Sequence, residues 1–119
     1  MALEVKGLTA GYGPVTVLHG VDFRAEPGQI TCLMGRNGVG KSTCLKCLMG
    51  LVPATEGSIK LDGAALQSLP AHEVPRQGLA YVPQGRRLFG PLTVAENLAV
   101  GGLVRGNDRA TLERVLALF

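Results

Sequence analysis

The chain has 119 residues and a hydrophobic fraction of 46%, which is enough for a folded core and excludes a largely disordered chain. Its net charge of +3 suits an anionic ligand, but the charges are too few and too scattered to indicate nucleic-acid binding. No apolar run reaches the roughly 20 residues that cross a membrane as a helix.

The first residues, Met-Ala-Leu-Glu-Val-Lys, lack the basic start and the apolar stretch of a signal peptide. Alternating apolar and polar residues predict strands over 3–8 and 15–23, with turn residues at 9–14 between them and an interruption at His19 and Gly20. The three cysteines, an odd number, suit a reducing compartment. We therefore expect a cytoplasmic protein that begins with a β region.

A turn at residues 26–28 is followed by the apolar run 29–34, which predicts a buried parallel strand. Residues 35–43 then read Gly-Arg-Asn-Gly-Val-Gly-Lys-Ser-Thr and fit the Walker A motif, or P-loop. The glycines let successive backbone N–H groups point into one concavity that holds phosphate oxygens. Lys41 can reach the β and γ phosphates, and the Ser42 hydroxyl can bind Mg²⁺. The segment therefore predicts binding of a nucleoside triphosphate.

A helix is expected over 41–49, ending at Gly50. Cys44 and Cys47 form a C-x-x-C pair within it. Structural zinc needs four ligands, and the sequence has no second Cys/His pair at a suitable spacing. We therefore interpret the two cysteines as small buried helix residues.

The second half of the chain predicts several shorter elements. A strand at 57–63 ends in an Asp-Gly turn, a short helix at 70–77 is limited by Pro75, and the apolar run 79–82 predicts another strand. Thr93 and Glu96 fit a capping box that opens a helix to about residue 100. A last helix over 110–119 ends on an apolar residue without a cap, which indicates a truncated chain.

The order of these motifs resembles the amino-terminal half of an ABC transporter ATP-binding subunit. The residues that carry the resemblance are 33–43, 81–89 and 92–98. Within the superfamily the chain is similar to the branched-chain amino acid and urea importer group. Arg36, Val39 and the Gly-Arg-Arg that follows Gln84 favour the urea branch.

The resemblance implies an α/β fold, the P-loop NTPase fold of an ABC-type nucleotide-binding domain. We expect its amino-terminal portion: an antiparallel β region, an incomplete parallel core sheet and the start of the helical subdomain. Residues 1–91 would form the core subdomain, and residues 92–119 the start of the helical one.

The resemblance also assigns roles to individual residues. Tyr12 matches the aromatic residue that stacks on adenine, and Gln84 matches the Q-loop glutamine that contacts Mg²⁺ or the attacking water. The alternatives are a tyrosine that packs at a strand end and a solvated loop amide. The expected ATP-binding residues are Tyr12, Gly35, Asn37, Gly38, Val39, Gly40, Lys41, Ser42 and Thr43. The expected catalytic residues are Lys41 and Gln84, and the expected Mg²⁺ ligands are Ser42 and Gln84.

Two kinds of protein partner follow from the resemblance, and nucleic acid is not among them. In the family, the region of Arg86, Arg87 and Phe89 lines the groove for a coupling helix of the transmembrane permease subunit. The alternative is a solvated basic turn with a partly buried phenylalanine. A second ATP-binding subunit would complete the site, which implies a peripheral location on the inner face of the plasma membrane.

Several family motifs do not occur in the sequence. It has no Leu-Ser-Gly-Gly-Gln-like signature, no apolar strand ending in Asp-Glu (Walker B and the catalytic glutamate), and therefore no switch histidine after them. ABC hydrolysis needs a water-positioning carboxylate and a site shared by two subunits. We therefore expect the parent protein to be an ATPase, and the 119-residue chain alone to hydrolyse ATP poorly and to be marginally stable.

Two other functions stay open. A soluble ABC protein of translation or DNA repair would have a second cassette or a long coiled coil. A GTPase or small-molecule kinase would use a P-loop of another class. A GTPase should contain Asn-Lys-x-Asp, which is absent, and an aromatic residue before the P-loop favours adenine.

Overall fold

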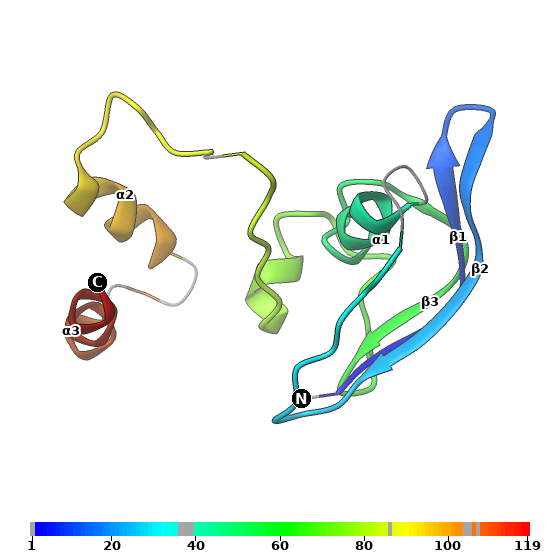
Figure 1. The fold of residues 1–119 in the computed structure, drawn as a ribbon, viewed down its shortest axis with the longest axis horizontal. Helices are drawn as coiled ribbons and strands as arrows, with labels where there is room; N and C mark the ends of the chain where they lie inside the picture. Colours follow the sequence, from blue (N-terminus) through cyan, green and yellow to red (C-terminus); the bar gives the residue numbers. More distant parts are fainter. Residues whose placement is uncertain (1, 36–39, 86, 104–105, 107) are drawn as a thin grey trace. The chain divides into compact units, whose positions relative to one another are not determined.

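The computed structural model describes residues 2–35, 40–85, 87–103, 106 and 108–119. The chain forms two compact units, Met1–Tyr81 and Val82–Phe119, which are described in turn. Figure 1 follows the chain through both units.

The first unit is built on a four-stranded antiparallel sheet in the order β2-β1-β3-β4. The strands are β1 (Leu3–Tyr12), β2 (Val15–Ala25), β3 (Ala54–Leu61) and β4 (Ala64–Ala65). The three strands predicted in these regions are confirmed. β1 and β2 continue beyond their predicted ends, and β3 begins three residues earlier and ends two residues earlier than predicted. The antiparallel β region of the predicted fold is therefore present.

Two glycine bulges keep the apolar residues of β1 and β2 on one face of the sheet. Gly7 has φ 60° and donates its N–H to Asp22 Oδ1 at 2.5 Å, and Gly20 has φ 65° and donates its N–H to Thr9 Oγ1 at 3.1 Å. Each bulge adds one residue, so the next apolar side chain, such as Leu8, again points into the core. The interruption expected at residue 20 is therefore a bulge within a continuous strand.

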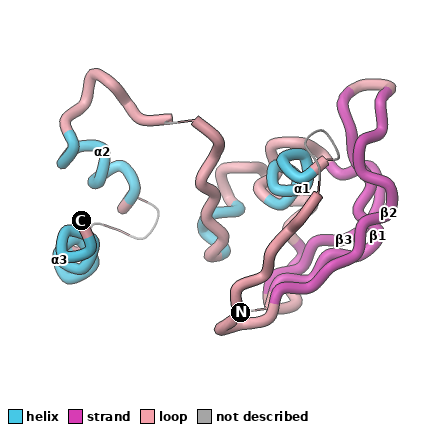
Figure 2. Tube along the Cα trace, viewed as in Figure 1, coloured by secondary structure: helices cyan, strands magenta, loops and turns pink. Residues whose placement is uncertain are grey.

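Helix α1 (Lys41–Leu48) lies beside the sheet and contacts β1 and β2 (Figure 2). The core between them is made of apolar side chains from the strands, the helix and the segment that follows β4. The buried hydrophobic residues are Val5, Leu8, Ala10, Leu18, Cys44, Cys47, Leu48, Met49, Val52, Ile59, Leu61, Leu66 and Val74. The helix ends as predicted, because Gly50 takes the left-handed conformation with φ 74°.

The predicted helix over 70–77 is only partly present. The structure has a single 3₁₀ turn, η1 (Val74–Gln77), with Pro75 in its first turn and Val74 buried in the core. Proline lacks an N–H and fits only the first turn of a helix, which explains why the element is short.

Two predicted strands are wrong. Residues 29–34 and 79–82 form no strand, and they pair with no other strand in the described part of the chain. Ile30 is 96% exposed and Val82 is 91% exposed. A parallel strand needs hydrogen-bonding neighbours, and these apolar runs have none among the described residues, so the predicted parallel core sheet is not formed.

The second unit contains helices α2 (Val94–Gly101) and α3 (Arg109–Leu118), close to the predicted bounds. The predicted capping box is confirmed: Thr93 Oγ1 accepts from the Glu96 N–H at 3.1 Å, and Glu96 Oε1 accepts from the Thr93 N–H at 3.2 Å. No described residue of either helix is buried. None of the helices described in either unit is long and apolar enough to span a membrane.

Candidate nucleotide-binding site

The described part of the Walker A segment begins the helix α1. Gly40, the N-cap, has φ 98°, and a Cβ at this position would lie 2.7 Å from Leu18 Cδ2 on β2. The left-handed conformation favours glycine, and a Cβ here would also displace the Leu18 side chain. The last glycine of the motif therefore sets the start of α1 directly against the sheet.

Part of the motif is not described. Asn37, Gly38 and Val39, together with Arg36, lie outside the described residues, so the predicted phosphate nest stays a prediction. The described members are Gly35, Gly40, Lys41, Ser42 and Thr43.

The described members bring a cation and an exposed serine to the helix start. Lys41 Nζ donates to the Gly35 carbonyl oxygen at 2.5 Å, so its ammonium group returns to the first residue of the loop. Ser42 is exposed, whereas Thr43 is only 6% exposed. No acidic side chain lies in the first turn of α1, so the positive end of the helix dipole is not neutralised there. This arrangement is suited to an anion, and the exposed Ser42 hydroxyl fits an oxygen ligand for Mg²⁺.

Tyr12 lies next to this helix start. Its hydroxyl is 3.2 Å from Thr43 Oγ1, although the two residues are 31 positions apart in the sequence. Tyr12 is 48% exposed at the end of β1, so much of its ring is free for contact. The structure therefore brings together the residues predicted for adenine and for phosphate.

A close backbone approach that the sequence did not reveal fixes the position of Tyr12. A Cβ on Gly11 would lie 1.9 Å from the Val15 carbonyl oxygen, so only glycine fits this place in the hairpin. Tyr12 pairs with Val15, and a two-residue Gly-Pro turn joins the strands. The sequence predicts turn residues at 9–14, but no local pattern shows which of the glycines there is required by contact.

Gln84 belongs to the second unit, where it is exposed in a bend after Pro83. Since this unit is described by itself, the proposed role of Gln84 at the magnesium ion stays a prediction. Arg86 lies outside the described residues, and Arg87 and Phe89 are exposed.

Asn97 organises the segment that follows Gln84, a role that was not predicted from the sequence. Its Oδ1 accepts from the Phe89 N–H at 3.0 Å, and its Nδ2 donates to the carbonyl oxygens of Phe89, Leu92 and Thr93 at 3.2, 3.3 and 2.9 Å. The side chain thus holds residues 89–93 against the first turn of α2. The available signal was an asparagine inside a predicted helix, where this residue is unfavourable unless its amide has a partner.

The interpretation of Cys44 and Cys47 is confirmed. Their exposed fractions are 2% and 3%, and they are not bonded to each other. Burial raises the pKa of the Cys44 thiol, and burial followed by the proximity of Cys44 raises that of the Cys47 thiol to about 11. Both thiols are therefore protonated at neutral pH, and the described residues contain no group of three metal-binding side chains.

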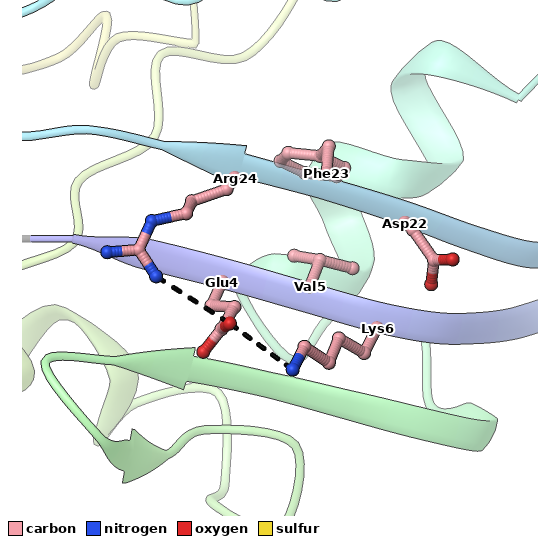
Figure 3. Close-up of a pocket in the computed structure, with 6 residues that line it drawn as sticks. All are labelled: Glu4, Val5, Lys6, Asp22, Phe23 and Arg24. Atoms are coloured by element: carbon pink, nitrogen blue, oxygen red, sulfur yellow. Dashed lines mark ion pairs between the residues drawn. The ribbon is translucent and has the colours of Figure 1, made fainter.

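A shallow depression on the sheet has a different character. Figure 3 shows the Glu4 carboxylate paired with both Lys6 and Arg24, with Oε1 at 3.4 Å from Lys6 Nζ and 3.6 Å from Arg24 Nη1. Hydrogen bonding and charge from Glu26 raise the pKa of the Arg24 guanidinium. These charges neutralise one another, so we assign no ligand to this face.

Known proteins of one family are similar to this chain. The sequence profile of the ABC transporter family matches residues 18–119. The high-affinity branched-chain amino acid transport ATP-binding protein BraG of Pseudomonas aeruginosa is 44% identical over 110 residues, which are 91% of this chain and 47% of that protein. BraF of the same organism is 42% identical over 98 residues, 82% of this chain and 38% of that protein. The ribose import ATP-binding protein RbsA of Oceanobacillus iheyensis is 41% identical over 101 residues, 85% of this chain and 20% of that protein.

Solved structures lead to the same family. The structure of an ATP-binding subunit of an ABC transporter has a TM-score of 0.79 and 33% identity, and the match covers 96% of this chain and 47% of that one. A bacterial Atm1-family ABC exporter with ATP bound has a TM-score of 0.77 and 29% identity over 92% of this chain and 19% of that one. The chain spans about half or less of the length of the relatives it matches. The predicted α/β class and the ABC-type fold are confirmed, and the chain belongs to the ABC transporter family of ATP-binding proteins.

Proposed function

We propose that this chain is the ATP-binding portion of an importer subunit that couples ATP binding and hydrolysis to solute uptake. The observation that carries the proposal is the position of Tyr12, whose hydroxyl lies 3.2 Å from Thr43 at the start of α1. Adenine and the phosphates belong to one ATP molecule, so the residues that bind them must lie close together. An aromatic ring beside a phosphate-binding helix start meets this requirement.

In this proposal the residues of the site divide between adenine, the phosphates and the magnesium ion. Adenine lies on the exposed face of Tyr12, and the loop Gly35, Asn37, Gly38, Val39 and Gly40 surrounds the phosphates. Lys41 offsets the charge of the β and γ phosphates, and its ammonium group already lies at the loop, 2.5 Å from the Gly35 carbonyl oxygen. Thr43 contributes to the phosphate end of the site.

Mg²⁺ would be held by Ser42, whose hydroxyl is exposed, and by Gln84. The ion would neutralise charge on the phosphate oxygens while the γ-phosphoryl group is transferred to water. Lys41 would bind and orient the phosphates, and Gln84 would orient the attacking water. Since the sequence lacks the signature and Walker B motifs, we expect the 119-residue chain by itself to hydrolyse ATP poorly.

The proposed solute is a branched-chain amino acid or urea. BraG, BraF and a probable LivF protein of Archaeoglobus fulgidus, at 44%, 42% and 42% identity, support the amino acid, and Arg36 and Val39 favour urea. Ribose and Fe(3+) import proteins are also similar, at 41% and 39% identity. We therefore rank amino-acid uptake first.

The proposed partners are transmembrane permease subunits and a second ATP-binding subunit, at the inner face of the plasma membrane. Leu88 is 71% exposed and Phe89 is 56% exposed, next to Arg87. Exposed apolar side chains of this size are typical of contact surfaces, which supports permease binding through the segment after Gln84. Copurification with branched-chain amino acid permease subunits distinguishes this function from a soluble ABC protein.

Calorimetric titration with ATP tests the nucleotide site. We expect Lys41→Ala to weaken binding about 10- to 100-fold, because it removes a charge-assisted contact to phosphate. Lys46→Ala, on the last turn of the same helix, is the matched control and should bind like the wild type. Stronger binding of GTP than of ATP would reject the adenine assignment and favour the other P-loop classes.

A further inference from the structure

The hydrogen bond between Tyr12 and Thr43 joins the two ends of the proposed site, and it gives Thr43 a second task. We propose that the Thr43 hydroxyl positions the Tyr12 ring, so that Thr43 controls how strongly the chain prefers an adenine nucleotide to a bare polyphosphate. This inference rests on the proposed function, in which Tyr12 contacts adenine.

The two ends of this hydrogen bond differ in rigidity. Thr43 is 6% exposed and lies in the first turn of α1, between the Gly40 start and the buried Cys44 and Cys47. Its side chain is therefore held by packing on the sheet. Tyr12 is 48% exposed at a strand end, so its side chain is less closely packed than that of Thr43. The rigid partner is Thr43, and the partner that gains order is Tyr12.

The hydrogen bond at the Tyr12 hydroxyl leaves the face of the ring accessible to adenine. The backbone of Tyr12 is fixed by the hairpin, where Gly11 approaches the Val15 carbonyl oxygen and Tyr12 pairs with Val15. Two side-chain torsions remain, and a hydrogen bond at the hydroxyl restricts both while covering only the polar tip of the ring. A ring ordered before adenine arrives loses less conformational freedom when it binds.

Thr43 and Ser42 thus have separate roles on one turn of helix. Ser42 is exposed, whereas Thr43 is turned toward the sheet and Tyr12. The hydroxyl of Ser42 serves the magnesium ion in the proposed site, and that of Thr43 serves the aromatic ring. Loss of the Thr43 hydroxyl should therefore affect ATP more than a ligand without a base.

The experiment measures the dissociation constants of ATP and of inorganic tripolyphosphate for the intact protein. The variants are Tyr12→Phe, Thr43→Val, the double variant, and Thr43→Ser, which keeps a hydroxyl. We expect the preference for ATP over tripolyphosphate to fall about three- to tenfold in Tyr12→Phe and in Thr43→Val. Thr43→Ser should restore most of the preference.

The double variant decides whether the two hydroxyls act through each other. If they do, it should have the same preference as each single variant, because the first substitution already removes the bond. Effects that multiply in the double variant would overturn the inference. A wild-type preference in Tyr12→Phe would overturn it too, as would a Thr43→Val variant that weakens both ligands equally.

Tyr12→Ala separates failure of this inference from failure of the adenine assignment. A preference that falls in Tyr12→Ala but stays at the wild-type value in Tyr12→Phe would reject only the positioning role of Thr43. A wild-type preference in Tyr12→Ala would show that adenine does not contact the ring, and both proposals would then fail.

Discussion

The two units of the chain are stabilised by different interactions. All buried hydrophobic residues in the described part of the chain lie between Val5 and Val74, and no described residue of α2 or α3 is buried. The second unit is instead organised by side-chain hydrogen bonds to nearby backbone, at Thr93, Asn97 and Asp108. Tyr12 and Thr43 therefore belong to the unit with a packed core, whereas Gln84 belongs to a unit that is stabilised by local hydrogen bonds.

The largest effect on stability should come from truncating a core side chain in the first unit. Leu8 is 0% exposed, and Leu8→Ala should lower the free energy of unfolding by about 3–5 kcal/mol, because burial is lost and a cavity is left. Urea denaturation followed by circular dichroism measures the change. Leu112→Ala in α3, where the side chain is 43% exposed, should cost less than about 1 kcal/mol. Equal losses for the two variants would contradict the comparison.

A smaller effect is expected where the core meets the P-loop. Gly40→Ala combines φ 98° with a contact of 2.7 Å to Leu18 Cδ2 and should lower the free energy of unfolding by about 2–3 kcal/mol. Gly13→Ala is the matched control, since its φ is 57° but no atom lies within 4 Å, and it should cost about 1 kcal/mol. The same denaturation assay measures both, and a Gly40→Ala variant no less stable than Gly13→Ala would show that the approach to β2 is unimportant.

In the second unit the effect should be local. Asn97→Ala removes the hydrogen bonds that hold residues 89–93, so the Phe89 amide should lose protection from hydrogen exchange, by about 1–2 kcal/mol of local stability. Asn97→Asp keeps the acceptor for the Phe89 N–H but loses the donor, and should retain much of the protection at Phe89. Exchange at Leu8 in the core should not change in either variant. An unchanged Phe89 exchange rate in Asn97→Ala would show that the turn does not depend on this side chain.

Features encoded by neighbouring residues could be predicted, and features that depend on distant partners could not. The capping box of Thr93 and Glu96 and the alternation in β1 are local patterns, and both were confirmed. Residues 29–34 have the composition of a strand, but a strand also needs a paired neighbour, which composition does not supply. The Tyr12–Thr43 hydrogen bond and the close approach at Gly11 depend on tertiary geometry. The family resemblance indicated Tyr12 and Thr43 as site residues, but nothing in the sequence indicated that they contact each other directly.

The smallest effect should be a pH dependence at the start of α3. Asp108 accepts from the Thr111 hydroxyl at 2.7 Å and from the Ala110 N–H at 3.1 Å, and these bonds lower the pKa of its carboxyl group. A lowered pKa in the folded state means that the folded helix binds the proton more weakly, so the stabilisation is present above the unfolded pKa and is lost as the pH falls through the folded one. Helix content measured by circular dichroism should therefore decrease in acid more in the wild type than in Asp108→Asn, which keeps an N-cap acceptor but has no proton to bind. The same acid response in both would assign the loss to other carboxylates.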